Sequence, residues 1–135
     1  MSLFTIFDIS GSAMSAQNIR LNTTASNLAN SEAVSSSEAG AYRSRQPVFA
    51  TVFDRFNKGV AGVRVEGIVV NDAPVYREYA PENPLADEDG YIYKSNVNTV
   101  EEMANMISAS RAYQNSVEVI MTSKELALNT LRLGQ

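Results

Sequence analysis

The sequence predicts an α+β fold in which long N- and C-terminal helices pack as a coiled coil, with a small β-rich insert between them. The last forty residues contain no glycine or proline before Gly134, and their apolar residues recur at helical spacing. The N-terminal thirty residues repeat this spacing, whereas short apolar runs broken by turn residues fill the middle. We therefore expect a terminal helical domain formed by residues 1–30 with 99–135, a linker at 31–41 and a β-rich domain at 42–98.

The C-terminal helix has an incomplete apolar stripe. Steps of three and four residues place seven apolar side chains on one face: Val100, Met103, Ile107, Val117, Met121, Leu128 and Leu131. The same face also carries Ser110, Gln114 and Lys124. A helix of about thirty-four residues is roughly 50 Å long, which exceeds the width of a small domain. We expect such a helix to need a partner beyond its own small core.

The ends of this helix carry recognisable signals. Thr99 and Glu102 fit a capping box, in which the Thr99 hydroxyl accepts a free N–H and Glu102 reaches back to the cap. Arg132 and Gly134 are typical of a helix end. The segment Ser35–Glu38 also matches the capping pattern, but no periodic run follows it, so no helix is expected there.

The N-terminal helix shows the spacing of a coiled-coil seam. Its members alternate three and four positions apart: Phe4, Phe7, Gly11, Met14, Asn18, Leu21, Ala25 and Leu28. Asn18 within the seam is expected to fix register and partner number at a cost in stability. Packing on the C-terminal helix of the same chain and packing between chains are both compatible with this pattern.

The middle of the chain predicts four strands. They are residues 48–53, 63–70, 75–79 and 91–93, separated by glycine, proline and aspartate turns. Residues 31–40, rich in serine, alanine and glutamate, predict a flexible link. An insert of about fifty residues buries little surface, so it needs the helices or a neighbouring subunit for stability.

Composition narrows the function. The 135 residues include no cysteine and no histidine, which removes thiol chemistry and the commonest general base and metal ligand. The net charge is −4 without a basic stripe, so nucleic acid is a poor candidate partner. No apolar run approaches the length of a membrane-spanning helix. The first positive charge is Arg20, so the N-terminus lacks the basic region of a secretory signal and we expect no conventional secretion.

The chemical motifs have simpler interpretations. The acidic turn at residues 87–90 lacks the glycine and glutamate positions of a calcium-binding loop. Residues 59–62 (Gly-Val-Ala-Gly) fit a hairpin turn better than a phosphate loop. The basic residues Arg43, Arg45, Arg55 and Lys58 alternate with acidic residues and favour a solvated strand face. Because no nucleophile, base and orienting group occur together, we expect no catalytic, cofactor-binding or metal-binding residues and no enzymatic activity.

Several segments resemble the bacterial flagellar rod and hook family, and within it the proximal rod subunits. The first is Asn-Thr-Thr-Ala-Ser-Asn-Leu-Ala-Asn at residues 22–30, followed by Tyr42 and Arg43. Residues 83–87 (Asn-Pro-Leu-Ala-Asp), together with Gly90 and Tyr91, are similar to the middle-domain signature. The C-terminal similarity covers residues 96–103, 108–114 and 131–135.

The resemblance implies a structural subunit that polymerises through its terminal helices into the drive shaft transmitting motor torque to the hook. It implies export by the flagellar type III system without a cleaved signal, and a place in the periplasmic span of the basal body. The implied partners are further copies, rod proteins B, F and G, and ring and adaptor proteins at the rod base, without nucleic acid, small-molecule substrate or membrane insertion.

The residues expected at the assembly interface lie on both terminal helices. On the first they are Phe7, Met14, Leu21, Asn27, Leu28 and Asn30, and on the second they are Met103, Ile107, Tyr113, Val117, Ile120, Met121, Leu128 and Leu131. Tyr113 fits either a core aromatic residue or an interface anchor. A soluble coiled-coil adaptor or secretion chaperone is the alternative function. Such an adaptor would form a discrete helical oligomer, whereas a rod subunit would be a monomer with mobile ends.

Overall fold

The computed structural model describes residues 3–53 and 61–133, and within them the chain forms two helices and five strands. In chain order they are α1 (Leu3–Ala29), β1 (Val34–Ser35), β2 (Arg45–Phe53), β3 (Ala61–Val70), β4 (Tyr76–Tyr79), β5 (Tyr91–Lys94) and α2 (Thr99–Leu133). The predicted α+β class, with a helix at each end and a β-rich middle, is confirmed. The four predicted strands correspond to β2 to β5.

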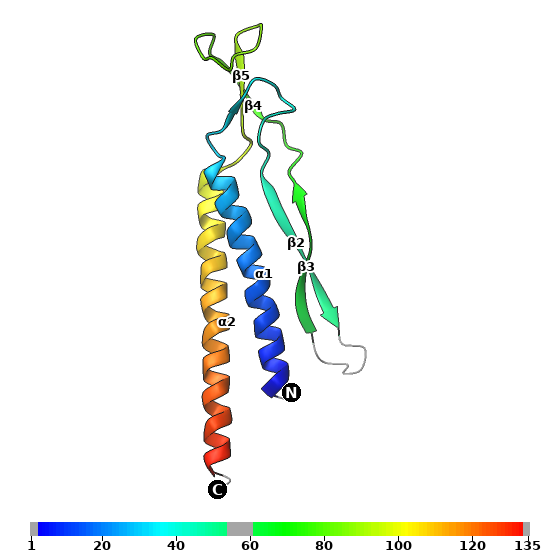
Figure 1. Ribbon diagram of the computed structural model, residues 1–135, viewed down its shortest axis with the longest axis vertical. Helices are drawn as coiled ribbons and strands as arrows, with labels where there is room; N and C mark the ends of the chain where they lie inside the picture. Colours follow the sequence, from blue (N-terminus) through cyan, green and yellow to red (C-terminus); the bar gives the residue numbers. More distant parts are fainter. Residues whose placement is uncertain (1–2, 54–60, 134–135) are drawn as a thin grey trace.

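The two helices form an antiparallel pair, and α1 lies between α2 and the β2–β3 ribbon (Figure 1). α1 has 27 residues and α2 has 35, so α2 continues past the N-terminal end of α1 (Figure 1). The buried side chains of the pair are mostly small: Ser10, Ala16, Thr23 and Thr24 on α1, and Ala109 and Ser123 on α2. Small side chains let two helix backbones approach closely, so close packing of small groups is one part of the contact between α1 and α2.

The start of α2 differs from the predicted capping box. Asn98, not Thr99, is the N-cap: its Oδ1 accepts hydrogen bonds from the backbone N–H groups of Val100 (3.1 Å) and Glu101 (3.3 Å). The side chain of Glu102 bonds to Asn27 on α1 instead of reaching back to its own cap. The capping prediction was therefore wrong by one residue, because asparagine at Asn98 is an equally good cap.

β2 and β3 form a two-stranded antiparallel ribbon along α1 (Figure 1). Val48 pairs with Gly67 and Phe49 with Val65, so Glu66 is an extra residue that forms a bulge and increases the local twist. The backbone N–H of Val63 donates to Ser12 Oγ of α1 at 3.2 Å. Of the predicted hairpin turn at 59–62, Gly62 lies in β3, and residues 59–60 lie outside the described part of the chain.

A second sheet, with strand order β1-β5-β4, lies at the end of the molecule where α1 ends and α2 begins (Figure 1). The predicted link at 31–40 contains β1, which pairs with β5, and no helix follows Ser35. The acidic turn is confirmed as a turn: Asp87 Oδ1 accepts from the backbone N–H groups of Asp89 and Tyr91. Gly90 has φ +80°, a left-handed conformation that favours glycine.

The side chain of Asn27, near the end of α1, is 1 % exposed and makes four hydrogen bonds. Its Nδ2 donates to the Arg45 carbonyl at 2.8 Å and to Glu102 Oε1 at 3.0 Å. Its Oδ1 accepts from the Tyr42 hydroxyl at 2.9 Å and from the Arg45 backbone N–H at 3.0 Å. One amide thus joins α1 to α2, to the first residue of β2 and to the loop before it. We call Asn27, Tyr42, Arg45 and Glu102 the Asn27 cluster.

Glu102 is an acidic member of this cluster and is buried. Burial raises the pKa of its carboxyl group, an effect opposed in part by the hydrogen bond from Asn27 and increased by the charge of Glu101. Thr24 and Arg20 of α1 act in the lowering direction. Burying the charged form of Glu102 therefore lowers the stability of the folded chain. Its Oε1 is nevertheless needed there, because it accepts the hydrogen bond from Asn27.

We expect Asn27→Ala to lower the free energy of unfolding by about 2–3 kcal/mol, because it leaves buried groups of Tyr42, Arg45 and Glu102 without a partner. Urea unfolding of the purified chain followed by circular dichroism measures this loss. Asn22→Ala is the matched control: among the described residues the Asn22 side chain bonds only to Asn18, on the exposed face of the same helix, so the loss should stay within about 0.5 kcal/mol. Equal losses in the two variants would contradict the central role of Asn27.

We expect Glu102→Gln to change the pH dependence of stability. The pKa of Glu102 is raised above its ordinary value of 4.5 in the folded chain, so the wild type loses stability as pH rises through the folded-state pKa. The glutamine keeps an acceptor oxygen but has no charge to desolvate. The variant should match the wild type at low pH and become relatively more stable towards neutral pH. If the free energies of unfolding of the variant and the wild type differ by the same amount at every pH in that range, burying the charge of Glu102 has no cost.

Candidate assembly interface

The apolar stripe predicted on α2 is largely exposed in the single chain. Its exposed members are 45–74 % accessible: Val100, Met103, Ile107, Met121, Leu128 and Leu131. Three further predicted residues, Tyr113, Val117 and Ile120, are half-buried. The structure therefore brings the expected α2 residues onto or beside one surface, and most of that surface has no partner within the described part of the chain.

The stripe is not the face that α2 turns towards α1. The buried residues of α2 are Glu102, Ala109 and Ser123, seven and fourteen positions apart. At about 100° per residue, the stripe that includes Met103 and Met121 is centred roughly a third of a turn around the helix from this face. α2 thus has an inner face of small residues that meets α1, and a separate outer stripe of large apolar residues.

A second set of exposed apolar residues lies on the opposite flank of α2 and was not predicted. Val119, Leu126 and Leu133 are seven residues apart and are 47 %, 59 % and 90 % exposed. A spacing of seven keeps them on one side of the helix, on the other side of the inner face from the outer stripe. The seven-residue spacing is visible in the sequence and could have predicted this set, although only three residues show it. α2 is therefore apolar on both flanks of its contact with α1.

The candidate residues at the N-terminal end of the chain divide into two groups. The half-buried ones keep part of their surface accessible: Phe7, Met14, Leu21 and Leu28 of α1, and Asn30, which lies in the turn just after α1 rather than in the helix as predicted. Asn27 is buried inside the chain and its hydrogen-bonding groups are satisfied there, so it supports the fold rather than presenting its side chain to a neighbour.

Asn18 was expected to fix register inside the α1 seam. The structure places Asn18 on an exposed face, where its Oδ1 accepts from Nδ2 of Asn22 on the same helix at 2.9 Å. In the single chain it therefore makes no contact that could set the register of α1 against α2.

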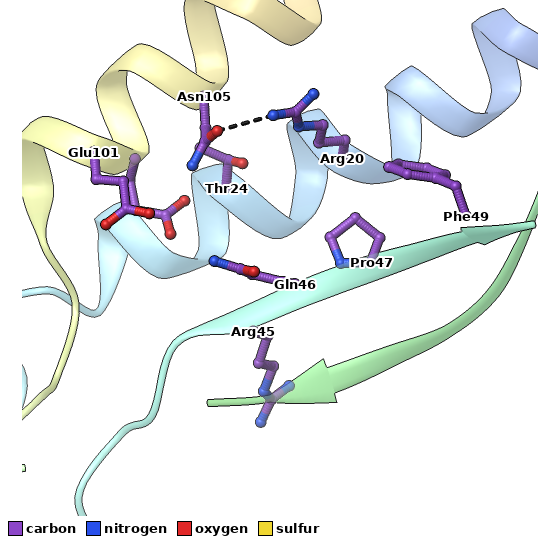
Figure 2. Close-up of a pocket in the computed structure, with 9 residues that line it drawn as sticks. Arg20, Thr24, Arg45, Gln46, Pro47, Phe49, Glu101 and Asn105 are labelled. Carbon is purple, nitrogen blue, oxygen red and sulfur yellow. Dashed lines mark hydrogen bonds between the residues drawn. The ribbon is translucent and has the colours of Figure 1, made fainter. Parts of the chain in front are cut away.

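A cleft of about 370 Å³ lies where α1, α2 and β2 meet. Figure 2 shows Arg20 of α1 donating to Asn105 of α2 (2.8 Å), with Pro47 and Phe49 of β2 facing α1. Arg20 and Glu101 give the cleft charges of both signs. Thr24 and Glu102 also line the cleft; both are buried, and the Glu102 carboxyl group accepts the hydrogen bond from Asn27.

The remaining chemical motifs contribute little to a site. Arg43 donates to the carbonyl of Ala73 and lies 3.6 Å from Glu38, and Arg45 lies over the Tyr42 ring. The other two members of the predicted basic group, Arg55 and Lys58, lie outside the described residues. Within residues 3–53 and 61–133, no group of three or more acidic side chains is placed to hold a metal ion. The described helices include none that is long and apolar enough to cross a membrane.

Two family models match the two ends of the chain. The model described as flagella basal body rod protein matches residues 7–34, which include most of α1. The model described as flagellar basal body rod FlgEFG protein C-terminal matches residues 88–133, which include β5 and α2. The matched segments contain Asn27, Glu102 and both apolar flanks of α2.

Curated relatives match over the entire chain. The flagellar basal-body rod protein FlgC of Yersinia enterocolitica is 50 % identical over 135 residues, covering all of both chains. FlgC of Salmonella typhimurium is 47 % identical over 135 residues, again with full coverage of both. FlgC of Buchnera aphidicola from Acyrthosiphon pisum is 40 % identical over 137 aligned positions with full coverage. The chain therefore belongs to the FlgC family of flagellar basal-body rod proteins and is a structural rod subunit.

Proposed function

We propose that this subunit polymerises through α1 and α2 into the proximal rod, the part of the drive shaft that transmits torque to the hook. The observation that carries the proposal is the exposed outer stripe of α2. Monomeric proteins rarely leave long contiguous apolar surfaces open, and such surfaces mark interaction sites. Each fully buried leucine or methionine of the stripe would contribute roughly 1.5–3 kcal/mol before ordering costs are subtracted.

The two apolar flanks of α2 favour a polymer over a closed dimer. A helix with one apolar flank could pair with a single further helix. α2 has the outer stripe, with Met103 and Met121, on one side of α1 and the Val119, Leu126 and Leu133 set on the other. Neighbours can therefore bind on both sides at once. Different patches that meet in a head-to-tail contact generate rings or helical filaments, which is the geometry of a rod.

The unequal helix lengths support the same proposal. α2 continues past the start of α1, and Leu131 and Leu133 in its last turn are 70 % and 90 % exposed (Figure 1). α1 of the same chain does not reach this turn. A helix from an adjacent subunit is the element that would cover it, in coiled-coil packing between chains rather than within one chain.

The domain division that we propose follows from this packing. Residues 1–30 with 99–135 form the assembling helical domain, residues 31–41 connect it, and residues 42–98 form the β-rich domain on its outside. Partners consistent with the family are further copies, rod proteins B, F and G, and ring and adaptor proteins at the rod base. The proposed place is the periplasmic span of the basal body, reached by type III export without a cleaved signal. A structural role of this kind needs no catalytic, cofactor or metal site.

We expect Met121→Asp to abolish motility and to remove the subunit from purified basal bodies, because a carboxylate on the outer stripe would be buried without a partner. Soft-agar motility and immunoblotting of basal bodies measure the two effects. Ser108→Asp is the charge-matched control, since Ser108 is exposed on α2, well over a quarter turn from Met103 and Met121 and eleven residues before the first member of the second apolar set. Normal rods containing the Met121→Asp subunit would disprove assembly through this stripe.

Hydrogen exchange separates the rod subunit from the adaptor alternative. The purified chain should be a monomer in which exchange is fastest in the parts of α1 and α2 far from the Asn27 cluster, because their apolar flanks lack partners. Amides of the strands and of the cluster should exchange more slowly. A discrete oligomer with uniformly protected helices would support an adaptor or chaperone instead.

A further inference from the structure

The β2–β3 ribbon has an exposed apolar face of its own. The register and the alternation of side chains place Val48, Val52 and Val69 together on one face of the ribbon. They are 42 %, 42 % and 56 % exposed. The half-buried residues Val63 and Val65 belong to the other face, which packs along α1. The ribbon thus has an inner face against α1 and an outer valine face without a partner among the described residues.

The same ribbon also has an open edge. Among the described residues β3 pairs only with β2, and no strand lies along its other edge. That edge contacts α1 at Val63, whose N–H donates to Ser12 Oγ. At the end of β3, Ile68, Val69 and Val70 are consecutive and all at least 45 % exposed. β3 contains no proline, whereas β2 has Pro47. An exposed apolar edge strand without proline is a template for pairing with another strand.

The second sheet and its turns offer a complementary surface. Residues 71–98, which we call the distal lobe, contain six acidic and two basic residues and have a net charge of −4. The described ribbon strands contain Arg45, Arg64 and Glu66, a net charge of +1. β4 is the edge strand of the distal sheet, and its Tyr76 and Tyr79 are 65 % and 63 % exposed. Opposite charges steer two surfaces together, and exposed tyrosines are typical interface anchors.

We propose that the ribbon of one copy binds the distal lobe of a second copy of this chain, with the open edges of β3 and β4 side by side. The two surfaces differ, so the contact is head-to-tail and can repeat along a rod. Both surfaces have an open strand edge and exposed apolar side chains, and their net charges have opposite signs. The proposal rests on the proposed rod function and adds an outer contact to the helical one.

Cysteine crosslinking in assembled basal bodies tests this contact, because the chain has no native cysteine. The variant Val69→Cys/Tyr76→Cys is expressed in place of the wild-type subunit, and the basal bodies are treated with a short bismaleimide. We expect crosslinked dimers and larger multiples of this subunit, at a yield several-fold above that of either single-cysteine variant. The pair Val69→Cys/Asn129→Cys, which joins the ribbon to an exposed helix position, should give only the yield of the single variants.

Failure of this inference differs from failure of the proposed function. Motile cells whose basal bodies contain the double variant but yield no self-dimers would overturn the ribbon–lobe contact and leave the rod function intact. Crosslinks only to other rod proteins would overturn it equally. If the first pair prevents assembly, Gly67→Cys/Tyr76→Cys gives the same test two residues along the edge, on the same face as Val69 and with open space for a side chain. A wild-type subunit absent from basal bodies would overturn the rod function itself.

Discussion

The structure depends on one buried amide. Asn27 fills its donor and acceptor positions with groups from α2, from β2 and from the loop that joins α1 to the ribbon. These elements lie at separate places in the sequence, and the fully buried side chains between the helices are mostly small. Because an unpaired buried amide is costly, the arrangement that satisfies Asn27 is strongly favoured over its alternatives. The cluster therefore fixes how the helix pair and the β-rich part are joined.

The division of residues on α2 follows from this arrangement. Small residues meet α1, and the large apolar residues stay on the two flanks, where they are exposed. This arrangement leaves much of the large apolar surface of α2 available for neighbours. Exposing this apolar surface to water is unfavourable, and contact between several chains removes most of it from water.

Periodicity predicted both helices, the four longer strands and the exposed stripe of α2, because large apolar residues dominate such patterns. It could not identify the face that meets α1, since Ala109 and Ser123 give no apolar signal. The same limit explains why β1 was placed in a flexible link: two residues are too short to show alternation. The cap at Asn98 was missed because Thr99 and Glu102 offered an equally good local pattern. Asn27 was placed at the interface because the sequence does not show that Tyr42, Arg45 and Glu102 converge on it.

A density map of the assembled basal body tests the central claim most directly, because it shows what covers the outer stripe of α2. The account predicts that Met103, Ile107 and Met121 pack against helices of neighbouring subunits, with Asn27 still buried inside its own chain. A map in which these three side chains face solvent or an open channel, while the subunits touch only through their β-rich parts, would contradict it.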